Sequence, residues 1–183
     1  MIRNMITERH NIASRIIIEA LDKGAYGAKL VYTDVGSNTR VSDEGIDISE
    51  VANKALPTWL LPNLSEQERS RPSRPDAIFI LPAISCSTHI TDLNFAPSHS
   101  DSTQFDPRAW DVHLIEFKVC EDTRPEAQLA RAREQNSTLL SRLRTQHYNK
   151  VHLNTILCGV MRTIYTEYTD TPLKNLGLNH YYN

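Results

Sequence analysis

Two carboxylates and a lysine in two short segments have the types and spacing needed for metal-assisted hydrolysis. Asp76 follows a proline at the start of the apolar segment DAIFILPA, and Glu116 and Lys118 lie two residues apart in WDVHLIEFKVC. Two carboxylates, water and a phosphate oxygen suit the octahedral oxygen coordination that Mg²⁺ prefers. Such an ion polarises a phosphate and lowers the pKa of a bound water, while Lys118 could orient that water and offset developing charge.

The strand predicted for residues 110–120 carries two charges in a row that could otherwise be buried, and a metal site would explain them. Its apolar and polar residues alternate, and because residues two apart share a face, Glu116 and Lys118 interrupt one row of a strand that otherwise could be buried. Burying either charge alone would be costly. If residues 76–83 and 110–120 form a hairpin, Asp76 and Glu116 converge at one end, and a cleft holding a metal ion explains both charges.

The remaining elements follow from apolar periodicity and from capping and breaking residues. Helices are predicted at residues 8–23, 65–70, 123–146 and within 162–178, strands at 28–36, 76–83, 110–120 and 151–160, an extended or helical piece at 46–55 and a long loop at 85–109. The core order αβββαβ, with hairpin and crossover connections, predicts an α/β domain with a mixed sheet flanked by helices.

Local features support these helices. Ser65 and Glu68 have capping-box spacing, and Thr123 could cap the helix that begins beside Pro125. The apolar stripe predicted for the first helix consists of Ile12, Ala13, Ile16, Ile17, Ala20 and Leu21.

Length and composition indicate one ordinary globular domain spanning residues 1–183. The chain is 40% hydrophobic and 23% charged, with a formal net charge of -2, which does not exclude a local basic surface for nucleic acid. Three cysteines favour a reducing compartment, and neither a secretory signal nor a membrane-spanning run is recognisable, so we expect the cytoplasm or nucleus and no membrane partner. An alternative zinc site would use Cys86, His89 and His99.

The two segments also resemble a known family pattern. RPD at residues 74–76 and EFK at 116–118 look like the P-D…(D/E)-x-K motif of the restriction-endonuclease-like nuclease superfamily, whose core order is similar to the one predicted here. The resemblance implies a restriction-endonuclease-like fold and a Mg²⁺-dependent DNA endonuclease, with Mn²⁺ able to substitute and 5′-phosphate and 3′-hydroxyl products. About forty residues separate Asp76 from Glu116, so Asp92 remains a competing acidic residue.

A narrower resemblance rests on ERHN at residues 8–11 and SRPD at 73–76. Both are similar to the endonuclease domain of site-specific non-LTR retrotransposons, which nicks target DNA to prime reverse transcription. This resemblance implies a polymerase or targeting domain as a partner in the same element. The superfamily likeness further implies Glu19 as an additional metal ligand and Gln128 as a residue near the site, although Glu19 could simply lie on the polar side of its helix.

Basic residues gather in and after the helix predicted at residues 123–146. Arg124, Arg131 and Arg142 could contact DNA phosphates with little sequence preference, or could form an ordinary solvated helix face. His10 could contact phosphate or the cleft, or could have a structural role near the start of its helix.

Two other classes of function remain open from the sequence. One is a catalytically silent nuclease-like domain that binds nucleic acid or protein, and the other is a purely structural α/β domain, in which Glu116 and Lys118 form a surface ion pair of little energetic value. A G-x-S-x-G nucleophile motif and a G-x-x-x-x-G-K-[ST] phosphate loop are absent, so the sequence gives no support to a serine hydrolase or a P-loop enzyme.

Overall fold

The computed structural model describes residues 2–22, 28–34, 56–69, 75–83, 106–120, 124–159 and 165–178. Its centre is a four-stranded mixed sheet in the order β1-β2-β3-β4. The strands are β1 (Lys29–Thr33), β2 (Ala77–Pro82), β3 (Trp110–Cys120) and β4 (Lys150–Gly159). The first three strands pair antiparallel and β4 pairs parallel to β3, which confirms the predicted mixed sheet.

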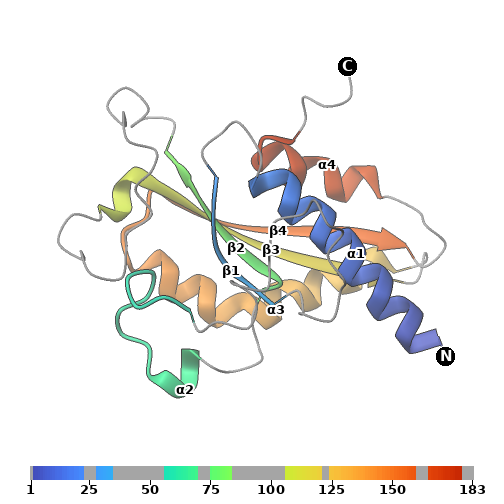
Figure 1. The fold of residues 1–183 in the computed structure, drawn as a ribbon, viewed down its shortest axis with the longest axis horizontal. Helices are drawn as coiled ribbons and strands as arrows, with labels where there is room; N and C mark the ends of the chain where they lie inside the picture. The colour runs from blue at the N-terminus through green and yellow to red at the C-terminus, as the bar shows by residue number, and fades with distance from the viewer. Residues whose placement is uncertain are drawn as a thin grey trace, which may run out of the picture.

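Helices cover both faces of this sheet (Figure 1). They are α1 (Ile2–Asp22), α2 (Glu66–Arg69), α3 (Pro125–Arg144) and α4 (Thr166–Asn175), with a 3-10 turn at Pro107–Ala109. α3 connects the parallel strands β3 and β4 and packs on one face, while α1 and α4 lie on the other. The predicted α/β order, helices flanking a mixed sheet, is therefore confirmed at this level.

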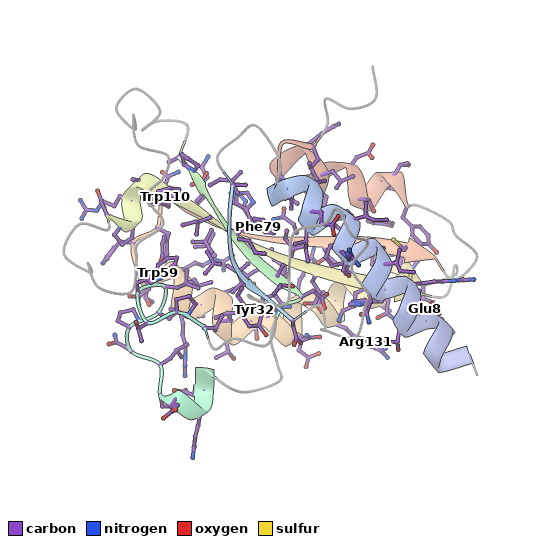
Figure 2. All side chains as sticks on the ribbon, viewed as in Figure 1. Glu8, Tyr32, Trp59, Phe79, Trp110 and Arg131 are labelled. Carbon is purple, nitrogen blue, oxygen red and sulfur yellow. The ribbon has the colours of Figure 1, made fainter. Side chains whose placement is uncertain are left out.

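Alternating residues of the strands feed two separate hydrophobic cores. Val112 and Leu114 of β3 pack with Leu140 and Leu143 of α3, whereas Ile115 and Phe117 pack with residues of α1 and α4. Tyr32 of the edge strand β1 belongs to the first core, and Phe79 of β2 belongs to the second (Figure 2). Because each fully buried large side chain stabilises the fold by about 1.5–3 kcal/mol, the sheet that positions the charged residues is firmly held.

Two local predictions for helix starts have different outcomes. The capping box is confirmed, because the Ser65 backbone and hydroxyl groups donate to Glu68 and the Glu68 N–H donates to the Ser65 hydroxyl oxygen. For α3, the predicted cap Thr123 lies outside the described residues, and Arg124 at the N-cap position makes no capping side-chain hydrogen bond. Pro125 is the first helical residue, as predicted, because its fixed φ suits that position.

The predicted apolar stripe of α1 is wrong in part. Ile12 is 47% exposed and Ile16 is 62% exposed, whereas Ser14, Ile18 and Leu21 are buried. Ser14 can be buried because its hydroxyl donates to the His10 carbonyl oxygen in the preceding turn. This internal hydrogen bond lets a polar residue occupy the buried side that the apolar periodicity had assigned to the isoleucines.

Several predictions fall outside the described ranges. They are the piece at residues 46–55, most of the loop at 85–109, the alternative zinc ligands Cys86, His89 and His99, and the competing Asp92. None of the helices in the described part of the chain is long and apolar enough to cross a membrane.

Candidate active site

The β2–β3 hairpin brings Asp76 and Glu116 together, as the sequence predicts. Ala77 pairs with Ile115, so Asp76, one residue earlier on β2, lies opposite Glu116 on β3. The Phe117 N–H donates to Asp76 Oδ2 over 2.7 Å, which fixes the aspartate side chain across the end of the hairpin. The two carboxylates are near enough for the charge of Asp76 to affect the pKa of Glu116.

Glu116 is a buried carboxylate with two polar partners. Its side chain is 2% exposed, Oε1 forms an ion pair with Lys118, and Oε2 accepts a hydrogen bond from Asn136 Nδ2 over 3.1 Å. Burial and then the negative charge of Asp76 raise the pKa of Glu116, and the opposing contacts with Lys118 and Asn136 do not cancel this rise. A divalent cation between the two carboxylates would relieve the same repulsion.

Lys118 lies between this buried charge and the surface. Its side chain is 21% exposed, and Nζ donates to Gln135 Oε1 over 3.0 Å as well as contacting Glu116. An ammonium group at the edge of a carboxylate site can contact a substrate while it keeps its ion pair with the carboxylate. The role of Lys118 beside an attacking water stays a prediction.

His10 extends the same cluster from α1. Its Nε2 lies 3.1 Å from the Phe117 carbonyl oxygen and 3.3 Å from Asp76 Oδ2, while Nδ1 lies 3.3 Å from Asn11 Oδ1. Burial lowers the pKa of His10, but the hydrogen bond and charge of Asp76, together with the contacts to Asn11 and the Phe117 carbonyl oxygen, raise it overall. All three neighbours are oxygens, so an imidazolium could donate to them from both ring nitrogens. His10 therefore lies beside Asp76, and its contact with phosphate stays a prediction.

The sequence analysis missed two residues of α3 that complete the site, Asn136 and Gln135. Asn136 is fully buried, and it donates both to Glu116 and to the Ala132 carbonyl oxygen one turn earlier. A pattern that could have found it is a polar residue inside the apolar stripe of α3, between Ala132 and Leu140. Glu116 interrupts an apolar row on β3, and Asn136 interrupts the apolar row of α3 that faces it. Two polar residues in facing apolar rows are predicted to be hydrogen-bond partners.

Two residues implied by the family resemblance do not join the site. Glu19 forms an ion pair with Arg15 over 2.7 Å, and it lies nine residues from His10, about 13 Å along the helix and half a turn round it. Gln128 lies eight residues before Asn136, about 12 Å along the axis of α3. The contact with Lys118 comes instead from Gln135, so the predicted roles of Glu19 and Gln128 are not supported.

The three arginines predicted to contact DNA differ in their surroundings. Arg124 and Arg131 are exposed, at the start and on the outer side of α3. Arg142 donates to Glu68 of α2 over 2.7 Å, and this bond together with the Ser65 hydroxyl lowers the pKa of Glu68 to about 2. Arg142 therefore has a structural partner, and the two earlier arginines are the better candidates for phosphate contacts.

Carboxylate oxygens and an ammonium group, which meet at this end of the hairpin, are the groups from which a divalent-cation site can be built. A carboxylate at a strand start, a buried carboxylate and a half-exposed lysine converge, with His10 and Asn136 fixing the carboxylates. No family model matches the chain, and neither the curated proteins nor the solved structures give a match. The case for a function therefore depends on the geometry of these residues and on their chemistry.

Proposed function

We propose that the protein is a Mg²⁺-dependent DNA endonuclease with a restriction-endonuclease-like core. The observation that carries the proposal is the convergence of Asp76 with Glu116 across the β2–β3 hairpin, with Lys118 beside them. The order of strands and helices, αβββαβ in the core, supports the same superfamily. A nicking role within a non-LTR retrotransposon, beside a polymerase or targeting domain, is part of this proposal and rests on the ERHN and SRPD segments.

The donor set fits Mg²⁺. Asp76 and Glu116 offer carboxylate oxygens, which magnesium prefers to nitrogen. Burial and then the negative charge of Asp76 raise the pKa of Glu116, and a cation beside the two carboxylates would offset both effects. The contacts of Asp76 with Phe117 and His10 use Oδ2, so we assign Oδ1 to the ion. Mn²⁺ has a similar preference for oxygen ligands and should replace it.

The position of each residue then indicates its role in hydrolysis. The bound cation supplies Lewis-acid polarisation of the phosphate and a more acidic water. Lys118 orients the attacking water and offsets the charge that develops on the phosphate oxygens. The water oxygen bonds to phosphorus and releases a proton to solvent, the bond from phosphorus to the 3′-oxygen breaks, and that oxygen takes up a proton from solvent and leaves as a 3′-hydroxyl. His10 and Asn136 hold Asp76 and Glu116 in place.

Arg131 and Arg142 provide a matched test of how DNA would be bound. Arg131→Ala should weaken duplex binding regardless of sequence and reduce the salt slope by about 0.9 for the lost phosphate contact. Arg142→Ala should leave affinity and slope unchanged, because its guanidinium binds Glu68. Fluorescence anisotropy from low to high salt measures both. Equal losses in the two variants, or none in Arg131→Ala, would contradict this surface.

Plasmid nicking tests the proposed activity. The wild type should convert supercoiled DNA to the nicked form with Mg²⁺ or Mn²⁺, EDTA should stop the reaction, and Asp76→Ala should abolish it. Cleavage that survives in Asp76→Ala would overturn the assigned site. Salt-dependent DNA binding that is insensitive to EDTA, without cleavage by the wild type, would instead identify a silent nuclease-like binding domain. Absence of both binding and cleavage would leave a structural domain.

A further inference from the structure

A second group of metal-ligating side chains lies on the sheet away from the carboxylate pair. Asp111 and His113 of β3 and His152 of β4 each offer a ligand atom, and these atoms all lie within 4.8 Å of one another. His113 and His152 are register partners in the parallel pair. Asp111 and Glu116 are five residues apart, so they lie about 17 Å apart along the strand and on opposite faces.

The two histidines are stacked, with ring centroids 4.7 Å apart and planes at 23°. His113 is buried and His152 is half-buried. Burial, followed by the nearby His152, lowers the pKa of His113 to about 3, and burial also lowers the pKa of His152. Each ring offers a ligand atom within 4.8 Å of the carboxylate of Asp111, and imidazole nitrogen is a common ligand of transition metals.

Neighbouring side chains hold the ligands in the manner of an outer shell. Asn149 Nδ2 donates to Asp111 Oδ1, and Asn154 Nδ2 lies 3.2 Å from His113 Nδ1. Asn154 is fully buried, and its Oδ1 has no hydrogen-bond partner within the described part of the chain. Turning the amide would let Oδ1 accept a hydrogen bond from Nδ1–H, the arrangement that orients metal-binding imidazoles and presents Nε2 to the ion. Either orientation leaves one amide atom unpaired, so hydrogen bonding alone does not choose between them.

We propose that Asp111, His113 and His152 form a site for a divalent transition-metal ion such as Zn²⁺, independent of the carboxylate pair. Tetrahedral bonds of about 2.0–2.1 Å place ligand atoms about 3.3 Å apart, so small side-chain rotations from the present separations close the site. Asp111 and His152 are half-buried, which leaves room for water as a fourth ligand. The ion would join the beginning of β3 to the beginning of β4.

Calorimetric titration of the full chain with Zn²⁺ in excess Mg²⁺ tests this site, because Mg²⁺ occupies oxygen ligands and leaves the imidazoles free. The wild type should bind one equivalent, and Co²⁺ should give the visible absorption of a tetrahedral site. His152→Ala and Asp111→Asn should each weaken binding at least about 100-fold, since loss of an outer-shell partner alone costs 10–100-fold. His147→Asn is the matched control, because it removes an exposed imidazole at a positive φ that asparagine tolerates.

Three outcomes would overturn the site: no binding by the wild type, one equivalent retained in both His152→Ala and Asp111→Asn, or loss of the equivalent in Asp76→Asn instead. Circular dichroism of each metal-free variant separates loss of the ligand from loss of the fold. If His152→Ala does not fold, Asp111→Asn decides. The titration involves no DNA, so its result is independent of the proposed nuclease activity.

Discussion

Lys118→Ala is expected to lower the rate of DNA nicking by about 10²–10³-fold at saturating Mg²⁺, the usual cost of removing one group that stabilises transition-state charge. Lys118 is half-exposed, and its ammonium group is held beside Glu116 by Gln135, where it can reach a phosphate. The loss should fall on kcat and leave DNA affinity largely intact. Single-turnover cleavage and anisotropy on the same duplex separate the two quantities.

Lys174→Ala is the matched control for this loss. Lys174 is an exposed lysine in the last turn of α4, and α4 packs on the face of the sheet opposite the one that carries Glu116, so its removal should not change the rate. A rate for Lys118→Ala equal to that of Lys174→Ala would remove Lys118 from the reaction.

Glu116→Gln and Lys118→Ala should differ in their effects on stability, although both impair cleavage. Lys118→Ala leaves a buried carboxylate without its cation and should lower the free energy of unfolding by about 3–5 kcal/mol at neutral pH. Glu116→Gln removes the buried charge while the amide can still accept from Asn136, so stability at neutral pH should not fall. Urea denaturation of the metal-free proteins measures both changes.

The pH dependence of the same urea denaturation shows whether ionisation of Glu116 stabilises or destabilises the fold. The pKa of Glu116 is raised in the folded protein, so the native state binds its proton more tightly than the unfolded chain. Ionisation of Glu116 therefore lowers wild-type stability as pH rises from about 4.5 through the folded pKa, and Glu116→Gln should not show this contribution. In the double variant Glu116→Gln/Lys118→Ala, most of the stability lost in Lys118→Ala should return. A Glu116→Gln protein as destabilised as Lys118→Ala would show that the carboxylate has a structural role.

The sequence predicts the sheet well because its strands have strong local patterns. β3 occupies residues 110–120 as predicted, and β2 and β4 agree within a residue at each end. The conflict between burial and charge at Glu116 correctly predicts the hairpin partner, because only a neighbouring strand could bring Asp76 to it. These inferences use the alternation of residues along a strand, which determines directly the face of the sheet on which each side chain lies.

The features that the sequence does not predict depend on tertiary geometry. Which side of α1 is exposed depends on the rotation of the helix about its own axis against the sheet. The Ser14 hydroxyl donates a hydrogen bond that lets Ser14 occupy the buried side, which the apolar pattern had assigned to Ile12 and Ile16. Gln128 and Gln135 are both polar residues on α3, and only the distance along the helix decides which one reaches Lys118. The Asp111, His113 and His152 group joins two strands whose relative register the sequence does not specify.

The central claim is that Asp76 and Glu116 hold one divalent ion between them, and counting bound Mn²⁺ by electron paramagnetic resonance tests it most directly. The His152→Ala background removes the contribution of the second cluster. We expect one bound ion in that parent protein, and loss of that ion when either Asp76→Asn or Glu116→Gln is added. The same Mn²⁺ count in all three proteins would contradict the claim.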